Sequence, residues 1–278
     1  MYNLIMYLTV KAFSQDSFDK FHKLVSNGDN LKQSGPQYDQ LIYKGVQITF
    51  YNNLTILFKG NINEDLEELI DVLIDKELYV GSDEVGVGEG VGPMVAAAIK
   101  FNDYESKKRV ILHGIKDSKK MNHNEIMVAA KVIKNNAEVQ LISLDPVKFN
   151  STYKKIPNVK KINAIMQNKI LSKFDGIKVT DEFVNLNKFK EYLSTANEEM
   201  FEGTFILEQK AEDKYMEVAA AAIVAKAYYN EWMINHCKEN NIPLEVGDKV
   251  KAQDLYLKIR SGEVKVSNPE LLMKDWTK

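Results

Sequence analysis

The sequence is poor in the residues that build disulfides and zinc sites. Its 278 residues include one cysteine, Cys237, and four histidines. A single cysteine excludes an internal disulfide, and this one lies in NEWMINHCKEN, a stretch typical of a helix. The histidines share no spacing typical of zinc binding or of an acid–base relay. These absences agree with a reducing cytoplasm and give no support to zinc or histidine chemistry.

Long apolar runs are also absent. No run reaches the roughly 18 residues that a membrane-spanning helix requires. The amino terminus, MYNLIMYLTVKAFSQDSFDK, has neither a basic segment nor a small-residue cleavage site. We therefore expect a cytoplasmic monomer that does not associate with membranes. The 45% apolar and 27% charged residues are typical of a globular protein with a sizeable core.

The net charge is only −2, but the charges are segregated along the chain. Residues 1–76 hold 7 lysines and 10 acidic residues, whereas residues 107–134 hold 8 basic residues and two acidic ones. The stretch from Lys148 to Lys173 holds 7 lysines and no acid. A solvated surface is the ordinary interpretation of such a stretch. An anion-binding face becomes the better interpretation if an acidic metal site lies nearby.

Secondary-structure patterns divide the chain into two parts. Residues 1–76 follow the order strand, helix, strands, helix, with a turn at Asn52-Asn53, which predicts a compact α+β domain. Residues 77–278 begin with two adjacent strands and then alternate helices with strands, which predicts a mixed sheet whose later strands are parallel. The final segment, residues 261–278, is predicted to be a loosely docked tail.

Acidic residues recur at the ends of the predicted strands in the larger part. They are Asp83, Glu84, Asp181, Glu212 and Asp213. Strand ends on one sheet edge bring such side chains together, and carboxylates at close range raise each other's pKa. A divalent cation removes this repulsion, and hard oxygen ligands select Mg²⁺ or Mn²⁺. The pattern therefore indicates a candidate metal site.

Four glycines at alternate positions follow the first acidic pair. They are Gly86, Gly88, Gly90 and Gly92. The dinucleotide-binding fingerprint fails in both registers, because Val91 and Pro93 stand where it requires glycine. The Walker pattern also fails, since no Gly-Lys-Ser/Thr follows. A tight turn between antiparallel strands accounts for one or two of the glycines, and the remainder would let backbone amides approach a ligand.

Five blocks of sequence resemble the type 2 ribonucleases H, most closely ribonuclease HIII, in their order and spacing. They are YVGSDEVGVGEGVGPMVAAAI, GIKDSKKM, FNSTYKKIPNVKKINAIMQNKIL, TDEF and KAEDKYMEVAAAAIVAKAYY, from about residue 78 to 235. The resemblance implies an α/β fold in residues 77–278, a ribonuclease H-like mixed sheet flanked by helices. Residues 1–76 resemble the small α+β domain of ribonuclease HIII that is related to the TATA-box-binding protein and binds substrate.

The same resemblance implies an endonuclease that cuts the RNA strand of an RNA/DNA hybrid and leaves 3′-hydroxyl and 5′-phosphate ends. Matched by position, the catalytic and metal-binding residues are Asp83, Glu84, Asp181 and Glu212, with Asp213 as the alternative fourth acid. Two Mg²⁺ or Mn²⁺ ions would be held there. One would activate the attacking water and the other would stabilise the leaving oxygen.

Substrate contacts are implied as well. The backbone amides of Gly86, Val87 and Gly88 would approach RNA 2′-hydroxyls, and phosphate or sugar contacts would come from Ser118, Lys119, Lys120 and Asn150. Val87 replaces the arginine usual in ribonuclease HII, which favours HIII. The carboxyl end gives no good match to the basic and aromatic closing segment of the family.

Two other function classes are less well supported. A binding module with an inactive site is disfavoured because all four acidic positions are filled, and a nucleotide-dependent enzyme is disfavoured by the failed glycine registers. In the amino-terminal part, Tyr43, Phe50 and Tyr51 are candidates for contact with the hybrid, although core packing is the better interpretation of each.

Overall fold

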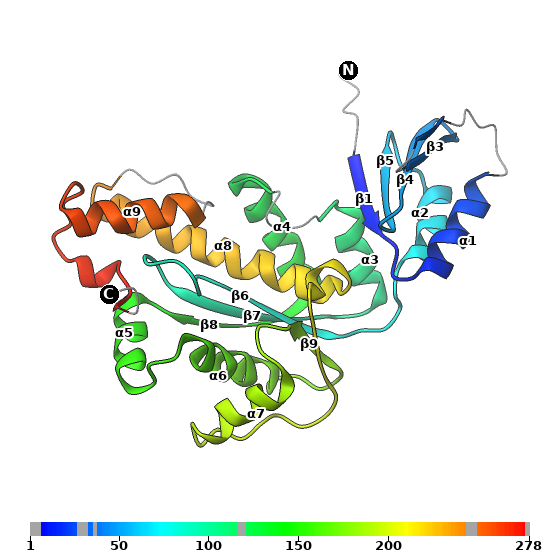
Figure 1. The fold of residues 1–278 in the computed structure, drawn as a ribbon. Helices are drawn as coiled ribbons and strands as arrows, with labels where there is room; N and C mark the ends of the chain where they lie inside the picture. Colours follow the sequence, from blue (N-terminus) through cyan, green and yellow to red (C-terminus); the bar gives the residue numbers. More distant parts are fainter. Residues whose placement is uncertain (1–6, 27–32, 36–37, 116–120, 243–248, 276–278) are drawn as a thin grey trace. The chain divides into compact units, whose positions relative to one another are not determined.

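The computed structural model describes residues 7–26, 33–35, 38–115, 121–242 and 249–275. The chain forms two compact units (Figure 1). The first comprises Met1–Glu77 together with Asp103–Lys116, and the second comprises Leu78–Asn102 together with Asp117–Lys278. The predicted division near Lys76 thus lies one residue from the end of the first segment. The insertion of 103–116 into the smaller unit had no signal in the sequence.

The smaller unit contains an antiparallel sheet in the order β1-β5-β4-β3-β2. Its described strands are β1 (Tyr7–Lys11), β2 (Gln33–Gly35), β3 (Tyr38–Tyr43), β4 (Val46–Tyr51) and β5 (Thr55–Lys59). Its described helices are α1 (Gln15–Ser26), α2 (Glu64–Ile70) with a 3₁₀ turn at Asp71–Leu73, and α3 (Tyr104–Leu112). The predicted order of strand, helix, strands, helix in residues 1–76 is confirmed.

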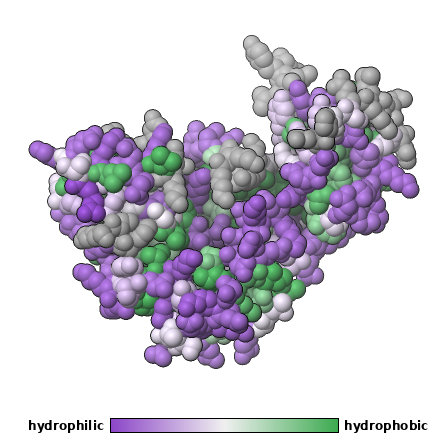
Figure 2. Space-filling model, viewed as in Figure 1, coloured by the Kyte–Doolittle hydropathy of each residue, from purple (hydrophilic) through white to green (hydrophobic). Residues whose placement is uncertain are grey.

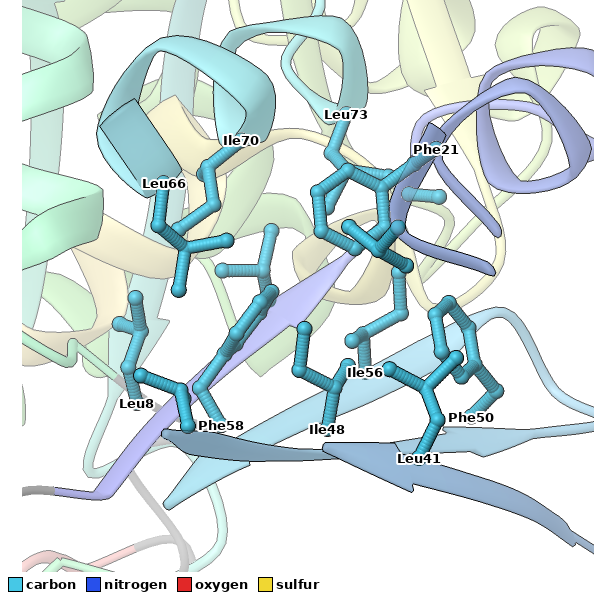
Figure 3. Packing of buried hydrophobic residues seen from close by; sticks show 14 of the residues in the cluster. Leu8, Phe21, Leu41, Ile48, Phe50, Ile56, Phe58, Leu66, Ile70 and Leu73 are labelled. Atoms are coloured by element: carbon cyan, nitrogen blue, oxygen red, sulfur yellow. The ribbon is translucent and has the colours of Figure 1, made fainter. Parts of the chain in front are cut away.

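One face of this sheet forms the core of the unit with the helices (Figure 3). Phe58 and Ile48 on the strands point toward Phe21 on α1 and Ile70 on α2, and none of these four side chains is exposed. Phe50 is also buried in this core, so core packing is the correct interpretation of that aromatic residue. Alternating inward residues leave the opposite face of each strand to polar and aromatic side chains.

Helix α3 is attached to the small unit by buried polar contacts as well as apolar ones. The Tyr104 hydroxyl donates to Asp71 Oδ1 at 2.6 Å, and Lys108 Nζ lies 3.0 Å from the same atom. Lys107, only 3% exposed, donates to the carbonyl of Glu77 at 2.7 Å. These contacts explain why a segment distant in sequence joins this unit.

The larger unit is built on a mixed sheet in the order β10-β9-β6-β7-β8. The described strands are β6 (Val80–Val85), β7 (Met94–Phe101), β8 (Ala137–Leu144), β9 (Lys178–Asp181) and β10 (Phe205–Glu208). Strand β7 is antiparallel to β6 and β8, whereas β9 is parallel to β6 and to β10. The prediction of a mixed sheet with parallel later strands is confirmed.

Helices cover both faces of this sheet (Figure 1). The described helices of this unit are α4 (His123–Asn136), α5 (Pro146–Lys155), α6 (Val159–Leu171), α7 (Leu186–Ser194), α8 (Met216–Glu239) and α9 (Lys249–Ser261). Helix α8 packs on β6 and β7, and α6 packs on the other face of these strands. A Cβ on Gly81 of β6 would lie 2.3 Å from the backbone of Glu217, so glycine permits the close packing of α8.

Residues 272–275 of the carboxyl-terminal segment are firmly docked, so the prediction of a loosely docked tail was wrong for this part of it. Leu272 is fully buried and Lys274 is 1% exposed. The Gly92 amide donates to the Leu272 carbonyl at 2.8 Å, and the Lys274 amide donates to the Gly90 carbonyl at 2.9 Å. The tail therefore pairs its backbone with the glycine turn that follows β6.

The described surface is predominantly polar. In the view of Figure 2, hydrophilic residues cover most of the coloured surface. Among the helices that the structure describes, none combines the length and apolar character needed to cross a membrane.

Candidate active site

The sheet brings the predicted acidic residues to one edge. Strand β6 lies between β9 and β7, and its parallel pairing with β9 places Ser82 opposite Thr180. Asp83 and Asp181 are the next residues on these two strands and run in the same direction. Glu212 lies in a 3₁₀ turn, Ala211–Asp213, between β10 and α8. Three separate segments therefore contribute acids at the carboxyl ends of neighbouring strands.

Successive residues of β6 point to opposite faces of the sheet. Asp83 shares the α8 face with Gly81, whereas Glu84 points toward α6, where Gln167 Nε2 donates to Glu84 Oε2 at 2.8 Å. Asn163, one helical turn before Gln167, also hydrogen-bonds the Glu84 carboxylate. Both amides are buried, and these bonds partly oppose the rise in the pKa of Glu84 that its loss of solvation causes. They hold the carboxylate in a fixed direction.

Asn163 and Gln167 are site residues that the sequence prediction missed. Their carbonyl oxygens, Asn163 Oδ1 and Gln167 Oε1, are buried and have no hydrogen-bond partner among the residues that the structure describes. A buried polar atom without a partner lowers the stability of the folded protein. The hydrogen bonds that these two side chains donate to Glu84 offset this loss. Two amides spaced i, i+4 on the apolar face of KINAIMQNKIL were the available signal.

The acids strongly influence one another's protonation. Loss of solvation raises the pKa of Asp83 well above its usual value, and the charges of Glu84, Glu212 and Asp181 raise it further. The Glu84 amide, which donates to Asp83 Oδ1 at 2.8 Å, opposes the shift. Loss of solvation also raises the pKa of Glu84, with added repulsion from Asp181 and Glu212. The cluster carries unbalanced negative charge that a cation would neutralise.

Of the two candidates for the fourth acid, Glu212 interacts more strongly with the acidic pair than Asp213 does. Glu212 is among the main groups that raise the pKa of both Asp83 and Glu84, and Asp213 is not. The Ala211 amide donates to Asp181 Oδ1 at 3.3 Å, which ties the turn to the end of β9. This contact brings the residue that follows Ala211 to the cluster.

The donor set fits a hard divalent cation, although the acids alone do not form a closed site. In the part of the chain that the structure describes, no three Asp, Glu, His or Cys side chains are grouped so as to hold one metal ion. Mg²⁺ usually keeps several waters and binds through one or two carboxylates together with substrate phosphates. The arrangement therefore suits ions whose coordination the substrate completes.

Packing within the protein explains three of the four glycines, more than the one or two we expected. Gly86 has φ of +85°, and a Cβ there would lie 2.0 Å from the Pro93 carbonyl oxygen. A Cβ on Gly90 would lie 2.5 Å from the Tyr256 ring, and one on Gly92 would lie 2.5 Å from the Met233 sulfur. These glycines permit a turn that lies tightly against α8 and α9.

The residues between these glycines have different environments. Val87 is partly buried and packs its side chain against the apolar cluster that includes Phe149. The Gly88 amide donates to Glu89 Oε2 at 3.0 Å. A substrate oxygen at this amide would take the place of the Glu89 carboxylate.

Four further residues were predicted to contact substrate, and the structure describes only one of them, Asn150. Ser118, Lys119 and Lys120 fall outside the described residues. Asn150 is 8% exposed, and its side chain donates to the Met273 carbonyl at 3.0 Å and accepts from the Asp275 amide at 2.7 Å. Since both ends of its amide bind the tail, we do not include Asn150 among the proposed substrate contacts.

The lysine-rich stretch forms an exposed surface on α5, α6 and the segment after α6. Six of its seven lysines are exposed: Lys148, Lys154, Lys155, Lys160, Lys169 and Lys173. Lys148 lies 3.3 Å from Asp145, and Lys169 lies 2.7 Å from Glu198. The surface is solvated and remains strongly basic.

Comparisons with known proteins agree with this fold and site. A family model for ribonuclease HII matches residues 80–258. Ribonuclease HIII of Phytoplasma mali is 32% identical over 210 residues, which cover 73% of this chain and 72% of that protein. Ribonuclease HIII of Ureaplasma parvum is 27% identical over 66% of this chain, and the match spans 60% of the Ureaplasma protein, less than two thirds of its length.

Solved structures share the fold at lower identity. Bst-RNase HIII in complex with Mn²⁺ has a TM-score of 0.63 and 23% identity, covering 97% of this chain and 95% of that one. Aquifex aeolicus RNase H3 has a TM-score of 0.57 and 20% identity, covering 96% and 98%. Taken with the family match and the Phytoplasma relative, these findings assign the chain: it belongs to the ribonuclease HII family and, within that family, groups with ribonuclease HIII.

Proposed function

We propose that this protein is a ribonuclease H, an endonuclease that hydrolyses the RNA strand of RNA/DNA hybrids. The observation that carries the proposal is the set of mutually repelling carboxylates at one sheet edge, in a chain of the ribonuclease HII family. Three of these acids, Asp83, Asp181 and Glu212, come from separate segments, and Glu84 joins them from the other face of β6. Such a set is suited to phosphodiester hydrolysis with divalent cations.

Asp83, Glu84, Asp181 and Glu212 would hold two ions, Mg²⁺ or Mn²⁺. When bound, the ions supply Lewis acidity to the phosphodiester and lower the pKa of the attacking water. The similar Bst-RNase HIII structure is described as a complex with Mn²⁺. Buried amides of α6 keep Glu84 directed, and the Ala211 amide does the same for Asp181. The residues thereby fix ligand directions before substrate arrives.

Attack on the phosphorus from the side opposite the 3′-oxygen would release a 3′-hydroxyl and leave the phosphate on the 5′ end. The turn after β6 would select the RNA strand, because the backbone amides of Gly86, Val87 and Gly88 lie directly after the acids. A 2′-hydroxyl distinguishes RNA from DNA at such a position. Exposed lysines of α5 and α6 would contact phosphates without reading sequence.

The outward face of the small sheet would provide a second contact with the hybrid. Four strands, β1, β3, β4 and β5, each contribute three outward positions, and none of these twelve residues is acidic. Lys11 and Lys59 are among them, although residues 1–76 as a whole have more acids than lysines. Lys59 Nζ lies 5.7 Å from the centre of the Tyr7 ring. This face is locally suited to a polyanion.

The proposal is tested by incubating the purified protein with a labelled RNA/DNA hybrid in Mg²⁺ or Mn²⁺. Duplex DNA, duplex RNA and single-stranded RNA of the same sequence serve as controls. We expect cutting of the hybrid RNA strand alone, with products that a polymerase extends from their 3′-hydroxyl ends. Absence of hybrid cutting with either ion would refute the proposal.

The choice of fourth acid is tested with matched variants. Glu212→Gln should lower kcat by on the order of 10³, whereas Asp213→Asn should change it less than about threefold. Circular dichroism spectra of both variants check that the turn change has not unfolded the protein. The reverse order of effects would assign the role to Asp213.

A further inference from the structure

The lysine nearest the end of the described chain is almost completely buried. Lys274 is 1% exposed, its Nζ donates to the carbonyl oxygen of Gly86, and it lies 5.5 Å from the centre of the Phe149 ring. A buried amine requires polar partners to offset its lost hydration. Burial lowers the pKa of Lys274 to about 7, and the charge of Glu89 opposes this shift. Both Gly86 and Glu89 belong to the turn that follows the acidic pair.

The backbone around Lys274 is joined to the same turn. The Lys274 amide donates to the Gly90 carbonyl at 2.9 Å, and the Gly92 amide donates to the Leu272 carbonyl at 2.8 Å. Between them, Val91 and Met273 form an antiparallel bridge. The tail is therefore a short strand-like partner for the second half of the turn, while the Lys274 side chain reaches the first half.

Asn150 fixes the direction of Lys274 from the opposite side. Its amide group donates to the Met273 carbonyl at 3.0 Å, and its carbonyl oxygen accepts from the Asp275 amide at 2.7 Å. One side chain thus binds the backbone on each side of Lys274. Because Asn150 lies on α5, it connects the tail to the main body of the larger unit.

The remaining face of the turn is supported by α8 and α9. The Tyr229 hydroxyl donates to the Val91 carbonyl at 3.1 Å, and the Tyr256 ring packs where a Gly90 side chain would lie. Contacts from the protein interior therefore reach Gly86, Gly90, Val91 and Gly92. Among the described residues of α8, α9 and the tail, none supports the backbone of the turn from Val87 to Glu89 in this way.

We propose that residues 272–275 act as an internal clamp on the glycine turn and that Lys274 is a positioning residue for substrate. Its hydrogen bond to the Gly86 carbonyl fixes the Gly86–Val87 peptide plane, which presents the Val87 amide and lies between the Gly86 and Gly88 amides. This inference rests on the proposed function, since it assigns those amides to the RNA strand. In this role Lys274 would act on the substrate through the backbone of the turn.

The first test replaces Lys274 by methionine, which keeps the length of the side chain and removes its donor. Lys265→Met, at an exposed lysine of the same carboxyl-terminal region, is the matched control. We expect Lys274→Met to lower kcat/KM for a hybrid about tenfold, mainly through KM. The rise in melting temperature produced by Mn²⁺ should equal that of the wild type, because the acids are untouched.

Hydrogen exchange separates failure of this inference from failure of the proposed function. In the substrate-free protein, amides of residues 86–90 should exchange at least about fivefold faster in Lys274→Met than in the wild type or Lys265→Met. Wild-type exchange in the turn together with wild-type kcat/KM would overturn the inference. If the wild-type protein cut no hybrid, the exchange result alone would decide the role of the clamp.

A second variant keeps the test decisive if Lys274→Met does not fold. Asn150→Ala removes the anchor and leaves Lys274 in place, so it should raise KM in the same direction by about threefold to tenfold. In a double-mutant cycle the two effects should fall well short of additive, because both act through the tail. Full additivity would show that Asn150 acts independently of Lys274 and would overturn the clamp.

Discussion

The helices of the small unit cover one face of its sheet, whereas helices of the larger unit cover both faces of theirs. The small sheet therefore has a whole face of outward side chains, none of them acidic in β1, β3, β4 and β5. In the larger sheet, the acids of the proposed site lie at the ends of β6 and β9, at Asp83 and Asp181. On an open face, substrate binding is shared among many weak contacts. At a strand end it depends on a few acids whose mutual repulsion destabilises the folded protein. Substitutions in the two sheets should accordingly differ in size and kind.

The largest effect is expected at the strand end. Asp83→Asn should lower kcat for hybrid cleavage by on the order of 10³ or more, because the amide cannot replace a charged ligand. Initial rates in Mg²⁺ and in Mn²⁺ measure this effect. Asp175→Asn, at an exposed position, is the control and should cut at the wild-type rate. A fully active Asp83→Asn protein would remove the basis for the comparison.

The next effect concerns the buried face of the small sheet. Phe58→Ala should cost the small unit about 3–5 kcal/mol, because it removes a fully buried ring that lies 5.7 Å from the Phe21 ring. Calorimetry should show a separate transition at lower temperature, with hybrid affinity lost once that transition is complete. A single transition at the wild-type temperature would show that the core in Figure 3 contributes little to stability.

A smaller effect is expected in the pH dependence of stability without metal. The pKa of Asp83 is raised in the folded protein, so folding favours its neutral form. The resulting penalty is absent below the unfolded-state pKa and grows as the pH rises through the folded-state pKa. In EDTA, the melting temperature of Asp83→Asn should therefore match that of the wild type near pH 4 and exceed it increasingly toward pH 8. A constant difference across this range would contradict the assigned repulsion.

The smallest effects are expected on the open face. Replacing Lys11 and Lys59 together by glutamine should weaken hybrid binding about threefold to tenfold at low salt and leave kcat unchanged. The slope of log affinity against log salt should become shallower by about 1 to 2. Lys44→Gln is the control. Lys44 lies in the β3–β4 hairpin, and its charge is already paired with Asp65 of α2 at 2.5 Å. Equal losses in the control and the double variant would argue against a binding face.

The sequence was sufficient to predict the order of strands and helices in residues 1–76, the mixed sheet of the larger unit and the meeting of the acids. Strand and helix periods are local, and parallel strands share an edge, so Asp83 and Asp181 were expected together. The membership of α3 in the small unit was not predictable, because it depends on Tyr104 and Lys108 meeting Asp71 across a long separation.

The role of the glycines and the tail could not be predicted for a similar reason. Gly90 and Gly92 are required because Tyr256 and Met233, which are distant in sequence, occupy the space that a side chain would need. Lysine is usually found on the surface, so its residue type predicts an exposed Lys274. Only the fold reveals the Gly86 carbonyl that accepts its hydrogen bond. Asn163 and Gln167 follow the period of a core helix, and nothing in that period distinguishes a buried amide that faces an acid.

Gly81 has no reactive side chain, but substitutions at this position should abolish activity as substitutions of the acids do. A Cβ at this position would lie 2.3 Å from the Glu217 carbonyl carbon and from the Val218 nitrogen. Since both are backbone atoms of α8, no side-chain rotation relieves the clash. Every missense change in its codon would therefore push α8 away from β6, two residues before Asp83. A selection for loss of hybrid cleavage should recover Gly81 variants beside those of the acidic residues, and these Gly81 variants should keep all four proposed metal ligands.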